Sequence, residues 1–145
     1  MPQISRRPLP KHIQEKMDNS LYEAVSLLKK KEEVIQFIGD LLTKTEKVMI
    51  PQRFAIAILL SKGWTFESIK DRLKVTQSTI TSVAKTLELS GGYRKAIEKL
   101  EKSENFREFW QEIERLHFRT SSQSQAFVDE ELIKKKLGHD KKTLV

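Results

Sequence analysis

Residues 66–85, FESIKDRLKVTQSTITSVAK, are the segment that most restricts what this chain can fold into. Each half of the segment carries apolar residues one helical turn apart, with a short polar linker between the halves. The apolar positions are Ile69 and Leu73 in the first half and Ile80, Val83, Ala84 and Leu87 in the second. In the linker, Val75 is placed to fill the angle between two helices, and Thr76 can cap the second helix. The spacing therefore predicts two short helices joined by a tight turn, a helix-turn-helix.

The second predicted helix turns short polar side chains outward, with one cation and no carboxylate. Such a strip suits base edges and phosphates. The candidate DNA-binding residues are Thr76, Gln77, Ser78, Thr79, Thr81, Ser82 and Lys85. Double-stranded DNA is therefore the expected partner, and the alternative is an ordinary helical hairpin within an all-α core.

Two lysines depart from the usual helix-turn-helix pattern. Lys70 stands where a small residue usually lets the helices approach, and Lys74 stands where a glycine usually makes the turn. We expect Lys70 to run its stem along the helix surface with its ammonium in solvent. We expect Lys74 to end the first helix at a modest cost in backbone strain.

Composition narrows the class of protein. A chain of 145 residues has room for one domain with a modest core, and its net charge of +7 favours a polyanionic partner. It has no cysteine, so disulfide and thiolate chemistry are excluded, and a cytoplasmic location is expected. The longest apolar stretch, Phe54 to Leu60, is far shorter than the roughly 20 residues of a membrane span, so no membrane association is expected.

Three regions are expected along the chain. Residues 1–18 contain three prolines and several cations, and predict a flexible basic arm that either follows DNA or has no function. Residues 19–118 have helical periodicity and form the predicted helix-turn-helix domain. Residues 119–145 predict a linker and a basic C-terminal tail, whose amphipathic piece from Phe127 to Leu137 either docks on the domain or stays mobile.

Before the helix-turn-helix, the pattern predicts two amphipathic helices, one from Asn19 to about Leu28 and one with the apolar stripe Val34 to Leu42, whose N-terminus carries Glu32 and Glu33. Thr43 precedes Glu46 by three residues, a capping-box spacing that predicts a short third helix ending at Ile50. Pro51 is expected to begin a further helix that ends near Gly63. That helix is apolar almost all round, so other helices must cover it from several directions. This requirement favours an intertwined homodimer. The partner is expected to cover the stripe Leu21, Val25 and Leu28 as well.

Residues 93–118 predict a long helical region that Ser103 breaks or re-caps. Its aromatic cluster, including Phe106, Phe109 and Trp110, has helical spacing and glutamate neighbours, which favours a packing or dimer surface over a base-stacking platform. The sequence does not predict an enzyme, a metal site or a cofactor. The three histidines, His12, His117 and His139, lack ligand spacing, and no nucleophile pair or phosphate-binding glycine loop is present.

The order and spacing of several short motifs resemble the Trp repressor superfamily, and in particular its Trp-repressor-like bacterial branch. The motifs are LYEAVSLLKKKEEVIQFIGDLLT, PQRFAIAILLSKG and STITSVAKTL, followed by Gly92-Tyr93, and the resemblance runs from about Asn19 to Leu100. It implies an all-helical, intertwined homodimer that presents two recognition helices to successive major grooves.

The resemblance also bears on the corepressor. Trp repressors hold tryptophan with a threonine and an arginine before the helix-turn-helix, matched here by Thr43 and Arg53, and with an arginine followed by glycine in the recognition helix. Ser82 and Val83 replace that second pair, and a lost charged contact and a branched side chain each cost about 1–3 kcal/mol. Tryptophan binding is therefore not expected. Thr43 is instead interpreted as a helix cap, and Arg53 as part of a surface or interhelical salt bridge.

The leading hypothesis is a sequence-specific, dimeric transcriptional regulator that works without tryptophan. One alternative is the helix-turn-helix DNA-binding subunit of a mobile-element recombinase. A third is a helical protein-interaction module whose basic surface is incidental.

Overall fold

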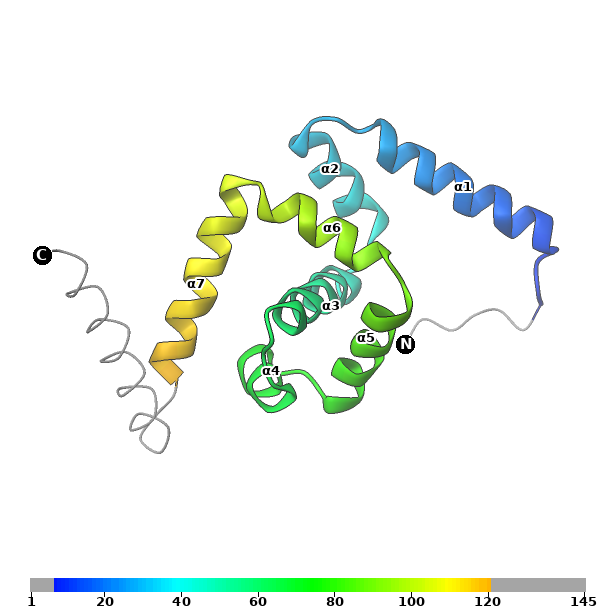
Figure 1. Cartoon of the computed structure of the whole chain (residues 1–145). Coiled ribbons are helices and arrows are strands. Elements are labelled where there is room, and N and C mark those ends of the chain that lie inside the picture. Colours follow the sequence, from blue (N-terminus) through cyan, green and yellow to red (C-terminus); the bar gives the residue numbers. More distant parts are fainter. Residues whose placement is uncertain (1–6, 121–145) are drawn as a thin grey trace, which may run out of the picture. The chain divides into compact units, whose positions relative to one another are not determined.

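The computed structural model describes residues 7–120 and, of their side chains, those through residue 115. These residues form seven α-helices and no strand, which confirms the all-α fold class (Figure 1). The helices are α1 (Lys11–Leu27), α2 (Lys31–Leu41), α3 (Glu46–Ser61), α4 (Phe66–Leu73), α5 (Gln77–Leu89), α6 (Gly92–Glu101) and α7 (Glu104–Thr120). The chain divides into two compact units, residues 1–50 and 51–145.

In the first unit, α1 begins at Lys11, about two turns before the predicted start at Asn19. Residues 11–18 are therefore helical and not part of a flexible arm. The Pro10 carbonyl accepts hydrogen bonds from the amides of Ile13 (2.9 Å) and Gln14 (3.2 Å), so this proline sits at the end of the helix, where it interrupts no hydrogen bond. Ile13 and Met17 also extend the stripe of Leu21 and Val25 backwards at four-residue spacing, a pattern that the prolines obscured.

The capping box before α3 is confirmed. The amide and the hydroxyl of Thr43 each donate to Glu46 Oε2 at 2.8 Å, and the Glu46 amide donates back to Thr43 Oγ1 at 3.3 Å. The expected boundary at Pro51 is wrong, because Pro51 lies inside one continuous helix. A proline lacks one amide donor, and little more than one turn of helix precedes this one, so few hydrogen bonds are disturbed.

The apolar faces of α1 and α2 remain open. Neither helix contains a buried residue. Leu21 is 37% exposed, Val25 44% and Ile35 60%, and Leu28 is half-buried. An amphipathic helix gains most of its stability from packing its apolar face, so these faces lack the cover that such helices normally have.

The core of the second unit is built around the C-terminal part of α3. Its buried residues come from five helices: Ile56, Ala57, Ile58 and Leu59 of α3, Ile69 of α4, Ile80 and Val83 of α5, Ile97 of α6 and Phe106 of α7. The apolar stretch of α3 is therefore largely covered by its own chain. Phe54, Ala55 and Leu60 of the same helix stay half-buried, so cover by a partner remains a prediction, although α7 supplies part of the cover.

Ser103 separates α6 from α7, as predicted. Its hydroxyl donates to the Leu100 carbonyl at 2.7 Å and accepts from the Phe106 amide at 3.3 Å, so it closes one helix and caps the next. The predicted linker and tail, residues 119–145, lie outside the described residues except for the last two residues of α7.

Candidate nucleic-acid interface

Helices α4 and α5 form the predicted helix-turn-helix (Figure 1). Thr65 Oγ1 caps α4 by accepting from the Ser68 amide at 3.2 Å, and Thr76 Oγ1 caps α5 by accepting from the Thr79 amide at 3.4 Å. Lys74 makes the turn with φ of 54°, the left-handed conformation for which glycine is better suited. The predicted end of the first helix at Lys74 is therefore confirmed, and the exposed side chain of Lys70 agrees with its expected place in solvent.

The buried residues of α5 fix its rotation. Ile80 is fully buried and Val83 is 3% exposed, so these two side chains anchor the helix in the core. The opposite face is open to solvent, as predicted from periodicity. The exposed candidates are Thr76, Gln77, Ser78, Thr81, Ser82 and Lys85, whereas Thr79 is half-buried.

The candidate residues fall into two groups by their hydrogen bonds. Thr76 Oγ1 lies 3.0 Å from Ser78 Oγ and 2.9 Å from Thr79 Oγ1, so these three hydroxyls are occupied with one another at the start of the helix. The side chains of Gln77, Thr81, Ser82 and Lys85 form no hydrogen bond or ion pair with any described residue. These four side chains can thus meet a ligand without breaking a contact within the described part of the chain.

The charge of this face suits a polyanion. The first turn of α5 contains no acidic residue, and Lys85 adds a cation one turn after Thr81 and Ser82. The amides at a helix N-terminus and the helix dipole both favour negative groups such as phosphates. The face therefore combines hydrogen-bonding side chains with a positive potential.

The four residues compared above with a tryptophan site are Thr43, Arg53, Ser82 and Val83. Thr43 is a helix cap, as interpreted, and its backbone and side-chain hydrogen bonds lower the pKa of the exposed Glu46 below its ordinary value of 4.5. Arg53 is exposed and forms no ion pair with a described residue, so the predicted salt bridge is absent there. Ser82 faces solvent, and Val83 belongs to the core.

An aromatic cluster next to the helix-turn-helix was only partly anticipated. Trp64, which directly precedes the capping residue Thr65, meets Trp110 of α7 edge to face, with ring centroids 6.3 Å apart. Trp110 in turn stacks on Phe106 at 6.3 Å and 18°. The sequence placed Trp110 and Phe106 on a packing face, but did not pair them with Trp64, because helical spacing does not say which helices meet.

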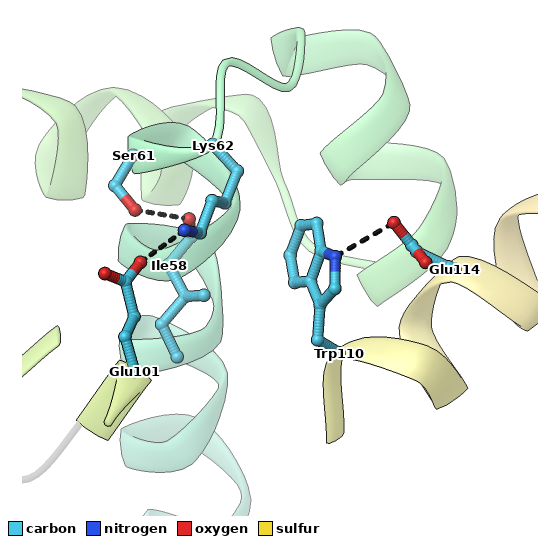
Figure 2. A network of polar contacts seen from close by, with 6 residues as sticks. All are labelled: Ile58, Ser61, Lys62, Glu101, Trp110 and Glu114. Atoms are coloured by element: carbon cyan, nitrogen blue, oxygen red, sulfur yellow. Dashed lines mark hydrogen bonds and ion pairs between the residues drawn. The ribbon is translucent and has the colours of Figure 1, made fainter. Parts of the chain in front are cut away.

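Lys62 joins this cluster to α6. Its ammonium lies 5.8 Å from the ring centroid of Phe106 and 5.9 Å from that of Trp110, within the range of cation–π attraction. The same ammonium pairs with the carboxylate of Glu101 (Figure 2). Figure 2 also shows the Trp110 indole N–H directed at Glu114, with an N···O distance of 2.9 Å. Helix α7 is thus held against the end of α3 and the start of α4.

The described residues offer little for other kinds of site. Among them, no three histidine or acidic side chains come together as metal ligands. No described helix is both long enough and apolar enough to cross a membrane.

An all-helical domain with a capped, outward-facing second helix belongs to the helix-turn-helix class. Residues 16–102 match the family model described as Trp repressor protein, so this chain belongs to the Trp repressor family. That family consists of DNA-binding transcriptional regulators and not of enzymes. Searches of curated proteins and of solved structures each gave no match. The matched region ends before α7, which begins at Glu104.

Proposed function

We propose that this protein regulates transcription by reading a specific sequence of duplex DNA with α5. The observation that carries the proposal is the free polar face of that helix. Gln77, Thr81, Ser82 and Lys85 are exposed and unpaired among the described residues, on a helix that Ile80 and Val83 hold in the core. A rigid helix with amide and hydroxyl groups on its outer face is suited to the major groove.

The regulator works as a homodimer. Support comes from the first unit, where Leu21, Val25 and Ile35 leave apolar surface on α1 and α2 exposed. A second copy can cover such faces, and contiguous exposed apolar surface commonly marks a protein interface. A two-fold dimer presents two copies of α5, which fits an operator with two half-sites about one helical turn apart.

The regulator does not use tryptophan as its corepressor. Ser82 provides no cation, and Val83 fills a place in the core, so neither side chain offers what an indole and a carboxylate need. Arg53 remains exposed, and the hydroxyl of Thr43 is already bonded to Glu46. Any effector of this protein is therefore expected at another site.

The test begins with capture and sequencing of bound genomic fragments, followed by gel shifts of the recovered site. Gln77→Ala should weaken the preferred site by about 1–3 kcal/mol, whereas Gln111→Ala, which alters an exposed glutamine on α7, should not. The logarithm of affinity should fall steeply with the logarithm of salt concentration. No recovered site, or an equal effect of both substitutions, would contradict the proposal.

A further inference from the structure

Helix α4 is held at both of its ends. At its C-terminal end, the side-chain amide of Gln52 in α3 donates to the Leu73 carbonyl at 3.4 Å. At its N-terminal end, the chain leaves α3 through a tight turn in which the Trp64 amide donates to the Leu59 carbonyl at 3.1 Å. Gly63 makes this turn possible with a φ of 82°, the left-handed conformation that commonly ends a helix. The turn has little freedom, so the start of α4 is fixed by where Trp64 lies.

The ring of Trp64 is held in turn by α7. Trp110 meets it edge to face at a centroid distance of 6.3 Å, and both tryptophans are half-buried. The indole N–H of Trp110 donates to Glu114 at 2.9 Å (Figure 2), and its ring stacks on the buried ring of Phe106. An edge-to-face pair adds to the energy of burial, so it opposes separation of the two rings. Trp110 therefore ties α7 to the residue directly before the cap of α4.

We propose that Trp110 is a positioning residue of the DNA-binding unit. Through Trp64 it fixes where α4 begins, and through α4 it fixes how α5 is presented to DNA. A shift of α4 is transmitted to α5, because Ile69 and Ile80 are both fully buried in one close-packed core. Presentation matters because base readout requires the outward side chains of α5 to keep hydrogen-bond distances to base edges. The effect on DNA rests on the proposed function, whereas the fixing of α4 does not.

Trp110 lies beyond residue 102, where the family match ends, so this contact is an addition to the matched region. A purely structural role for Trp110 predicts a different behaviour. Its loss would then lower the stability of the whole core, as the loss of any other half-buried ring of α7 would. Well below the melting temperature, the folded molecules would keep their local order at α4 and their DNA specificity.

Hydrogen exchange on the full chain without DNA tests the fixing of α4. The informative amides are those of Ser68 and Ile69, which donate to the hydroxyl and the carbonyl oxygen of Thr65 at 3.2 Å and 3.1 Å. The matched control is Phe109→Ala, which removes a half-buried ring that contacts Phe106 and leaves the Trp64–Trp110 pair in place. Both amides should exchange about fivefold faster in Trp110→Ala than in Phe109→Ala, because the aromatic pair no longer opposes local opening.

Two further substitutions at Trp110 separate its contact with Trp64 from its contribution to the core. Trp110→Phe keeps a ring and should return the exchange of both amides close to that of the unmodified chain. Trp110→Leu keeps apolar bulk but presents no ring to Trp64, so it should behave as Trp110→Ala does, and it serves where the alanine variant does not fold. Equal exchange at α4 in Trp110→Leu and Phe109→Ala would overturn the proposal.

Gel shifts with the recovered site and with an unrelated duplex of equal length test the effect on DNA. Trp110→Leu should weaken the recovered site about fivefold and leave the unrelated duplex unchanged, because phosphate contacts depend less on the presentation of α5 than base contacts do. Trp110→Phe should restore the affinity, and Phe109→Ala should change it by less than about twofold. An equal loss on both duplexes, or faster exchange at α4 with unchanged affinity for the site, would overturn the positioning role. If no site is recovered, the proposed function fails, whatever the exchange of α4 shows.

Discussion

Replacing Phe106 with alanine should show whether α7 belongs to the folded core. Phe106 is only 8% exposed, and its ring contacts Trp110 and Phe109 at centroid distances of 6.3 Å and 6.2 Å. Truncating a buried phenylalanine costs about 3–5 kcal/mol. Because this ring also borders an open apolar groove between α3, the end of α6 and the start of α7, the loss should fall at the lower end, about 3 kcal/mol. At about 2–4 °C per kcal/mol, the value for a chain of about 150 residues, the melting temperature should drop by roughly 6–12 °C.

Urea denaturation followed by tryptophan fluorescence is a suitable assay, because Trp110 stacks on Phe106 and Trp64 meets Trp110 in turn. Glu108→Ala alters an exposed residue of the same helix and should change the free energy of unfolding by less than about 0.5 kcal/mol. If the free energy of unfolding of Phe106→Ala lies within about 1 kcal/mol of that of the unmodified protein, α7 is not docked as described, and the cover that it gives to α3 is wrong.

Light scattering should give about twice the chain mass of 16.9 kDa, and a stable monomer at micromolar concentration would contradict the proposed dimer. Ile80→Ala should destabilise the fold by about 2–5 kcal/mol, because Ile80 is fully buried. Thr81→Ala should leave the melting temperature unchanged and weaken operator binding, because Thr81 is exposed. The reverse pattern would mean that the outer face of α5 is assigned wrongly. Titration calorimetry should detect no tryptophan binding, since Ser82 and Val83 supply neither cation nor space, and binding coupled to operator affinity would identify a tryptophan-sensing repressor. The carboxyl of Glu46 should titrate with a pKa below 4.5 by NMR. Its contribution to stability is then present above the unfolded pKa and lost as pH falls through the folded pKa, and an unshifted midpoint would show that the capping box is open in solution.

The helix-turn-helix was predictable because its determinants are local. The caps Thr65 and Thr76 act on amides three residues away, and the buried positions Ile69 and Ile80 follow from helical periodicity. Ser103 was predictable for the same reason, because its hydroxyl bonds only to backbone groups three residues away on either side.

The features that sequence reasoning missed depend on contacts between distant segments. Pro51 is the exception, since the helix runs through it for a local reason: the Thr43–Glu46 capping box starts the helix at Glu46, and little more than one turn precedes the proline. Trp64 and Trp110 are far apart in the chain, and their pairing has no signature in spacing. The cover that α7 gives to α3 was not predicted, because the amphipathic pattern of α7 does not reveal which surface it covers.

The proposed independence from tryptophan rests on two positions of α5, Ser82 and Val83, which have unequal consequences for stability. Val83 is 3% exposed and lies in the same core as Ile80, so a glycine in its place would remove a buried side chain. Burial of a valine stabilises a fold by about 1.5–3 kcal/mol, and glycine within a helix costs about 1 kcal/mol more. Ser82 is exposed, and an arginine there would cost the fold little. The cation of a tryptophan site could therefore be introduced at Ser82 with little loss of stability. Space for an indole could not be opened at Val83 without a larger loss of stability, because the packing that holds α5 in the core depends on the side chain of Val83.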